Sequence, residues 1–274
     1  MRKITYKHFL GFFIIAVILV SLFNVPINEY LIDFGTDTYD AKLIDKTVTN
    51  VFIIVLVFCL LKYLRIKYYF EFKNYKNYGY YLPLLFFVLV SSSNLLSIKN
   101  LDLSHTNWTT FLIFVFSILT SASLEEILFR GLFLGALLKL QPSSNKETTG
   151  FVVLSGLLFG IAHFMNVFYT TNGILGTVYQ IYAAIGFGVL YGATYIKTRN
   201  LLVLILVHAI TNFSSKIHEL SPDLSTDVVE LSENTNDTSL VVSSVLVFII
   251  YGIPLAIGLL LLAKVDTSDI KKFE

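Results

Sequence analysis

Long apolar runs separated by short polar segments are the feature that most restricts the fold of this chain. A helix that crosses a bilayer takes about 20 mostly apolar residues. Eight runs are candidates for such helices: 8–27, 48–64, 80–98, 108–128, 150–168, 173–196, 200–217 and 238–264. Only 14% of the 274 residues are charged, where an ordinary globular chain has roughly 25%. The sequence therefore predicts an all-α integral membrane protein, a polytopic helix bundle with about eight transmembrane helices.

The placement of lysine and arginine predicts that both termini face the cytoplasm. With eight spans and an internal N-terminus, fifteen of these residues fall in cytoplasmic segments. Four fall in external segments: Lys42, Lys46, Lys99 and Lys216. A missed or additional span would scramble this division, which follows the usual excess of positive charge inside. The first run resembles a signal peptide but is long and lacks a small-residue cleavage site, so we interpret it as a retained anchor.

Charge and cysteine content exclude several function classes. The formal net charge is +1, which gives no basic excess for binding nucleic acid. The single cysteine, Cys59, lies inside an apolar run, so a disulfide framework and a thiolate metal cluster are excluded. Acidic residues gather in the external loop at 218–237, where a solvated loop is the usual interpretation.

Charged residues within the fourth apolar run are the first candidates for a functional site. A charge at the centre of a bilayer costs about 2.5–3.5 kcal/mol on insertion scales, so such residues are functional candidates by default. Glu126 and Arg130 are four residues apart and can pair on one helix face. Glu125 lies about 100° around the helix from Glu126, where Arg130 is a poor partner. A charge cluster at the cytoplasmic interface is the alternative, but it explains two adjacent carboxylates badly.

Two further apolar runs carry imidazole and amide groups. His163 lies in one run, and His208 and Asn212 share one face of another. Taken singly, these residues fit hydrogen-bonded core positions or polar contacts between helices. Together with the glutamates, these residues supply the groups needed to add water to an amide carbonyl. A carboxylate and an imidazole can act as general bases, and an amide–imidazole pair can donate hydrogen bonds to the oxyanion. A serine or cysteine in a recognisable nucleophile motif is absent, which argues against an acyl-enzyme.

A divalent metal such as zinc is the one cofactor that the sequence suggests. His163, His208 and Glu125 would form a His₂Glu catalytic set. However, the HExxH spacing that places two ligands on one helix is absent, and the amide–imidazole pair suits an oxyanion better than a metal. We therefore favour water activation that requires no cofactor.

The order of these motifs resembles the CPBP family of intramembrane proteases. EExxxR at 125–130, FxxxH at 159–163 and HxxxN at 208–212 each lie in a separate apolar run. The family includes type II CAAX prenyl endopeptidases and the Abi proteins of bacteriocin processing and self-immunity. The resemblance covers about 107–217 and divides the chain into three parts. Residues 1–106 hold three spans, 107–217 the catalytic core, and 218–274 the acidic loop and the last span.

The resemblance implies a role for each motif residue. Glu125 would activate water, assisted by His163, and Phe159 would pack behind that histidine. Glu126 and Arg130 would stabilise the motif helix, with Glu126 also lining the site. The oxyanion pocket would be formed by His208 and Asn212. The family has been described both as metalloproteases and as glutamate-dependent proteases, so the resemblance leaves the metal open.

In this scheme Glu125 and His163 should act on one water, yet the sequence places them at different depths in the membrane. At 1.5 Å per residue, Glu125 lies about 5–8 Å from the cytoplasmic side and His163 about 18 Å from it. Tilt, or a later membrane entry for the fourth span, must close this gap. Since the apolar pattern of the fourth run continues past Arg130 to about Leu140, that span is expected to extend or to break.

The sequence thus predicts an intramembrane endopeptidase that acts in maturation of, or immunity to, a bacteriocin or signalling peptide. Membrane lipid and a peptide or lipidated peptide are its expected partners. Frequent Asn, Lys, Ile and Phe indicate an AT-rich bacterial source and a multi-pass protein of the plasma membrane. A non-catalytic immunity or scaffold protein that binds a partner is the first alternative. An ion-coupled transporter is the second, although the sequence shows no internal repeat in its support.

Overall fold

The fold is built from helices throughout the part of the chain that is described. The structure is a computed structural model, and it describes residues 27–67, 70, 75–100, 106–168, 173–221, 237–271 and 273. The long α-helices are α3 (Thr38–Tyr63), α4 (Leu82–Ser92), α5 (Trp108–Glu126), α7 (Asn145–Ala162), α8 (Gly173–Thr198), α9 (Leu201–Lys216) and α11 (Asp237–Leu262). The short α-helices are α2 (Asn28–Asp33), α6 (Gly135–Leu138) and α12 (Thr267–Lys271). Short helices of the tighter 3₁₀ type cover Tyr75–Tyr81, Ser93–Asn100, His163–Phe168 and Ile217–Leu220. The predicted all-α class is confirmed.

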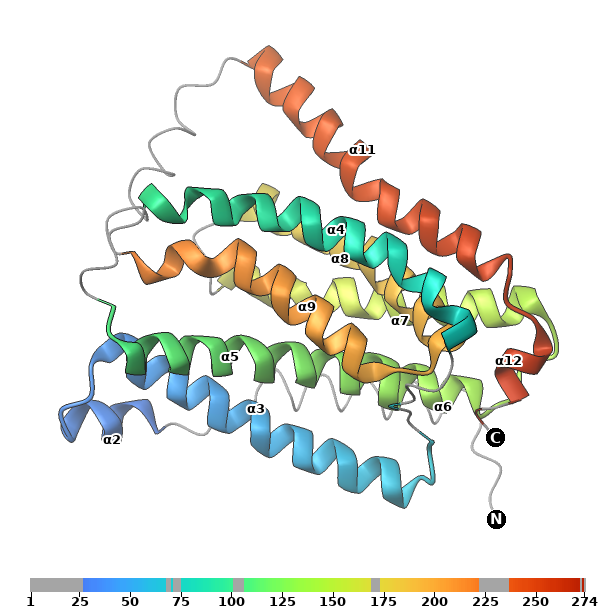
Figure 1. The fold of residues 1–274 in the computed structure, drawn as a ribbon, viewed down its shortest axis with the longest axis horizontal. Helices are drawn as coiled ribbons and strands as arrows, with labels where there is room; N and C mark the ends of the chain where they lie inside the picture. The colour runs from blue at the N-terminus through green and yellow to red at the C-terminus, as the bar shows by residue number, and fades with distance from the viewer. Residues whose placement is uncertain are drawn as a thin grey trace.

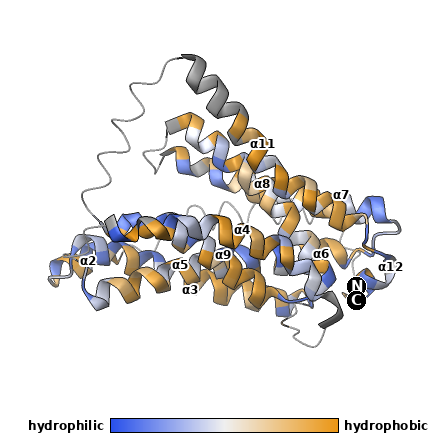
Figure 2. Ribbon diagram, turned by 45° about the horizontal axis from the view of Figure 1, so that its top comes forward, coloured by the Kyte–Doolittle hydropathy of each residue, from blue (hydrophilic) through white to orange (hydrophobic). Residues whose placement is uncertain are grey.

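Five of the described helices are long and apolar enough to cross a membrane. They are Thr38–Tyr63, Tyr78–Leu96, Trp108–Leu138, Ile174–Thr198 and Leu201–Leu220, and Phe248–Leu262 is a shorter apolar helix. Figure 2 shows hydrophobic residues along the long helices and hydrophilic residues at α2 and α12. The run expected at 8–27 lies outside the described residues. The chain is therefore a multi-pass membrane protein, while the count of eight spans stays a prediction.

The fourth apolar run extends past residue 128 to Leu138, as its continuing apolar pattern predicts. Asn107 caps α5 by accepting a hydrogen bond from the backbone N–H of Thr110. The chain then continues without a break through a π-helical segment, Ile127–Leu134, into α6. Such wide turns are rare and frequently lie at functional sites. At 1.5 Å per residue, this extension places Glu125 roughly 20 Å before Leu138. It therefore narrows the depth difference from His163.

Helix α5 lies in the middle of the motif-bearing helices. It packs against α3 on one side and α9 on the other (Figure 1). Behind it, α7 packs against α8, and α8 against α11. Large apolar side chains on the outer faces of these helices are exposed, such as Leu89, Phe116 and Leu260, and a lipid environment accounts for them because acyl chains take the place of water.

Glycines allow α7 and α8 to approach closely. A Cβ atom on Gly188 would lie 2.7 Å from the Cα of Gly156 on the facing helix. Gly156 and Gly160, four residues apart, both face α8 in this way. Small residues at this spacing are typical of tight helix contacts in membranes. The contact fixes α7, which carries Phe159 and His163, against α8.

Substituting alanine at Gly156 is expected to destabilise the protein. The added Cβ would meet the backbone N of Val189 at 3.0 Å and the backbone O of Ile185 at 3.1 Å, so the two helices must separate. We expect a loss of about 1–3 kcal/mol, as in other overpacked contacts. The matched control is Gly150→Ala on the same helix, where a Cβ meets nothing within 4 Å. Thermal unfolding in detergent should separate the two variants, and equal melting temperatures would show that the close approach is unimportant.

Candidate active site

A fully buried ion pair forms the base of the site. Arg130 Nη1 lies 2.9 Å from Glu126 Oε1, and both residues have 0% exposure. The guanidinium stacks over the rings of Phe159 at 4.5 Å and Tyr191 at 5.2 Å. Its Nη2 donates to the backbone O of Gly188 at 3.4 Å. The predicted pairing of Glu126 with Arg130 is confirmed, and the arginine joins α5, α7 and α8.

His208 connects this buried pair to the second glutamate. Its Nδ1 lies 2.8 Å from Glu126 Oε1, and its Nε2 lies 3.7 Å from Glu125 Oε2. Because a carboxylate only accepts hydrogen bonds, Nδ1 is the protonated nitrogen that donates to Glu126. In the neutral ring, Nε2 then presents its lone pair toward Glu125. The two adjacent glutamates therefore meet opposite nitrogens of one imidazole.

The two glutamates differ in environment, as their positions around the helix predict. Glu126 is fully buried, and its Oε1 serves both Arg130 and His208. The side chain of Glu125 keeps 31% of its surface exposed. Its Oε2 is itself buried and has no hydrogen-bond partner among the described residues, as is also true of Oε2 of Glu126, so the exposed part of the Glu125 side chain lies elsewhere. Glu125 is thus the carboxylate that is open to a water or a substrate, and Glu126 is the one committed to the protein.

Phe159 packs against both histidines of the site. Its ring lies 5.0 Å from that of His163 and 6.1 Å from that of His208, both in edge-on geometry. His163 begins the 3₁₀ turn after α7, and its Nδ1 lies 2.8 Å from the backbone O of Phe159. Since a carbonyl accepts, Nδ1 is the donor and Nε2 is left with its lone pair. The expected packing of Phe159 behind His163 is confirmed.

Two expected site residues lie at the edge of this arrangement. No hydrogen bond joins His163 to Glu125 within the described ranges. Asn212 lies one turn beyond His208 on α9 and is half-buried. Its side-chain amide makes no hydrogen bond in the part of the chain that the structure describes. The structure therefore brings together Glu125, Glu126, Arg130 and His208, with His163 one ring away and Asn212 beside them.

Sequence reasoning missed the contribution of α8. Tyr191 is buried and packs edge-on against the ring of His208 at 5.8 Å. It also lies under the guanidinium of Arg130, which hydrogen-bonds to the backbone of Gly188. The run that became α8 has no charge at this depth, so its sequence gave no sign of a site. The nearest signal is the pair of glycines around Tyr191, Gly188 and Gly192, which permit close helix packing.

The candidate metal ligands do not converge in this structure. Among the described residues, no group of three or more His, Cys, Asp or Glu side chains is placed to hold a metal ion. Glu125 and His208 are close, whereas the contact found for the His163 ring is with Phe159. The residues present therefore do not fit a three-ligand zinc site.

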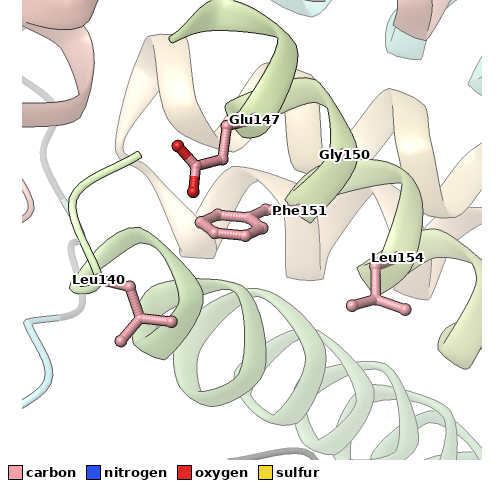
Figure 3. Close-up of a pocket in the computed structure, with 5 residues that line it drawn as sticks. All are labelled: Leu140, Glu147, Gly150, Phe151 and Leu154. Atoms are coloured by element: carbon pink, nitrogen blue, oxygen red, sulfur yellow. The ribbon is translucent and has the colours of Figure 1, made fainter. Parts of the chain in front are cut away.

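A surface hollow opens away from these residues. Leu140, Glu147, Gly150, Phe151 and Leu154 line it at the start of α7 (Figure 3). Figure 3 shows the carboxylate of Glu147 beside the ring of Phe151. Glu147 accepts from the backbone N–H of Ser143, which closes the cap of α7. Because the lining lies more than a turn before Phe159, we assign this hollow to the helix end and not to the site.

Comparison with protein families shows which proteins the central helices resemble. Residues 107–214 match the family model described as "Type II CAAX prenyl endopeptidase Rce1-like". This segment resembles the core of the CPBP-family intramembrane proteases. It holds EExxxR, FxxxH and HxxxN, and it contains α5, α7, α8 and most of α9. No curated protein and no solved structure matches the chain.

The match of residues 107–214 to the Rce1-like family model supports CAAX-type intramembrane endopeptidase activity. The five apolar helices agree with a membrane protease that crosses the bilayer several times. Helices α3 and α11 lie outside the matched segment, although α3 packs against α5 and α11 against α8. They are the parts of the bundle in which this chain can differ from other proteins of the family.

Proposed function

We propose that this protein hydrolyses a peptide bond in or beside the bilayer, with Glu125 as the base that activates water. The proposal is based on the different environments of the two adjacent glutamates. Glu126 Oε1 is held by Arg130 and His208, whereas the side chain of Glu125 is 31% exposed beside the same imidazole. A general base must reach the proton that it removes, and only Glu125 is open to do so.

Water addition can proceed between Glu125 and His208. A water that contacts the exposed side of the Glu125 carboxylate loses one proton to it as the water oxygen attacks the scissile carbonyl carbon. The protonated Glu125 then returns the proton to the departing amine, so that the amide C–N bond breaks and the carboxylate is restored. Positioned acid–base groups of this kind contribute about 10²–10⁴-fold to rate. We assign His163, whose Nε2 is unprotonated, to assisting Glu125 once substrate and water are bound.

The tetrahedral intermediate carries a negative oxygen that needs donors. His208 meets this need in its protonated form, because its Nδ1–H is committed to Glu126 and its Nε2–H then points toward the open side of the site. The amide of Asn212, one turn further along α9, supplies the second donor. Donors preorganised for an oxyanion are worth about 2.7–4 kcal/mol each in acyl-transfer enzymes. We assign Glu126 and Arg130 to holding His208 in place.

The biological substrate proposed here is a bacteriocin or signalling peptide, in maturation or in immunity. The bacterial composition of the sequence and the plasma membrane location inferred from it favour such a peptide over a prenylated protein. Membrane lipid surrounds the bundle, and the peptide or lipidated peptide reaches the site from the bilayer or its surface.

A peptide panel tests this function directly. Purified protein is incubated with quenched bacteriocin-leader and prenylated peptides, with and without a chelator, beside His163→Ala. We expect the wild type to cleave leader peptides, the variant to lose at least about tenfold in kcat, and the chelator to have no effect. If the wild type cleaves no peptide while His163→Ala preserves the cellular phenotype, the protein acts by binding a partner. Loss of cleavage with chelator, restored by zinc, would reassign the mechanism to a metal.

A further inference from the structure

A second buried ion pair lies at the end of α8, and the mechanism above gives it no role. Lys197 Nζ lies 2.6 Å from Asp269 Oδ2, and the two side chains are each 9% exposed. The ammonium group of Lys197 also lies over the ring of Tyr80 at 5.4 Å. Lys197 is in the last turn of α8, and Asp269 is in α12, into which the chain turns back after α11 (Figure 1). The pair therefore joins α12 to the end of α8.

Apolar side chains beside Asp269 are buried against the same helix. Ile270 and Phe273 are 5% and 2% exposed, and the ring of Phe273 lies 5.5 Å from that of Tyr195 on α8. Together with Val265, which comes just before α12, they belong to the apolar cluster that also contains Tyr191. We call α12 with Val265 and Phe273 the α12 clamp. The clamp is thus packed into the same cluster as the tyrosine that contacts His208.

The α12 clamp holds α8 from two different sides. Tyr195 and Lys197 are two residues apart, so their side chains leave the helix about 200° from one another. Phe273 contacts the first, and Asp269 pairs with the second. Contacts on two sides restrain both the rotation of a helix and its position along its own axis. The end of α8 is therefore fixed more firmly than packing on one face would fix it.

Tyr191 connects the clamped end of α8 to the site. It lies one turn before Tyr195, about 6 Å along the helix. Its ring lies 5.2 Å from the guanidinium of Arg130 and 5.8 Å from the ring of His208. A helix is a rigid element over so short a distance. A rotation of α8 at Tyr195 therefore moves the ring of Tyr191, and the imidazole of His208 loses the surface against which it packs.

We propose that Asp269 and Phe273 are positioning residues for His208, which they act on through α8 and Tyr191. This inference rests on the proposed function, because it concerns the histidine assigned to the oxyanion. The α12 clamp lies outside the segment that matches the Rce1-like family model. It thus supplies, from another part of the chain, a support that the motif-bearing helices do not provide by themselves.

Two clamp variants test this role without leaving a charge unpaired. Phe273→Ala removes the contact with Tyr195, and the combined Lys197→Gln and Asp269→Asn removes both charges of the pair. The ring ¹⁵N signals of His208 are recorded in detergent and are assigned by their loss in His208→Asn. We expect them to shift in both variants and to stay in place in Lys271→Gln, an exposed position of α12. Asp269→Glu, which keeps the carboxylate, should stay close to the wild type.

Kinetics on a quenched peptide supply the second measurement. We expect kcat to fall by as much as about 10²-fold in both clamp variants with little change in KM, because small displacements of catalytic groups cost this much in rate. If the clamp acts through Tyr191, adding Phe273→Ala to Tyr191→Leu should cause no further loss. Residues that act through a shared contact are not additive in this way.

The outcomes separate the positioning role from the proposed function. Unshifted His208 signals in both clamp variants, or losses in kcat that multiply with that of Tyr191→Leu, would overturn the positioning role and leave the protease function intact. Failure of both variants to fold would also overturn it, since the clamp would then be required for folding. Shifted His208 signals in a protein whose wild type cleaves no peptide would support the positioning role and reject the protease function.

Discussion

Replacing Glu125 with glutamine is expected to reduce kcat by about 10²–10⁴-fold, the contribution of a positioned general base. Glutamine keeps the shape of the side chain but cannot take a proton from water. KM should change little, because the substitution leaves the binding surface intact. The melting temperature should also hold, since Glu125 Oε2 makes no hydrogen bond in the described part of the chain and the side chain is 31% exposed. Steady-state kinetics on a quenched peptide, with thermal unfolding of the same preparation, measures both.

The control for this variant is Glu29→Gln, an exposed glutamate on α2. It should retain full activity and stability. Activity that survives in Glu125→Gln but disappears in Glu126→Gln would move the base to the buried glutamate. A large fall in melting temperature with Glu125→Gln would instead assign this carboxylate a role in folding, and the kinetic result would then say nothing about catalysis.

The helices that carry the site were predictable because charge in lipid needs a partner. Glu126 and Arg130, at a spacing of four, could be paired from the sequence, and the structure joins them at 2.9 Å. The meeting of three helices was also predictable, because three apolar runs each carry polar groups. The sequence did not predict which glutamate His208 binds. Its Nδ1 binds Glu126 and not Glu125, and this depends on how α5 and α9 are rotated about their axes, which helix packing determines.

Other features of the fold had no sequence signal. A π-helical turn at Ile127–Leu134 extends the fourth span, and residue spacing alone cannot distinguish it from an α-helix that simply runs longer. Tyr191 carries no charge and is typical of an apolar core position, yet it packs against both Arg130 and His208. The close approach of Gly156 and Gly188 determines which faces of α7 and α8 are in contact. The tyrosine reaches the site as a consequence of that contact.

Removing the buried arginine should have the largest effect on stability. Arg130→Met leaves Glu126 charged and without its cation in a fully buried position. Breaking one half of a buried pair costs about 3–5 kcal/mol. We therefore expect a large fall in the melting temperature and loss of activity, because His208 loses the fixed carboxylate that orients it. Arg65→Met is the matched control, since Arg65 has an exposed side chain.

A double substitution distinguishes charge from packing as the cause. Glu126→Gln added to Arg130→Met removes the uncompensated charge but keeps an amide oxygen that can accept from His208 Nδ1. If charge dominates, the double variant should be more stable than Arg130→Met alone, since replacing both members of a buried pair is often neutral. If the double variant is as unstable as the single one or more so, then stacking of the guanidinium on Phe159 and Tyr191 carries the stability. In that case the arginine acts chiefly as the contact that holds α5, α7 and α8 together.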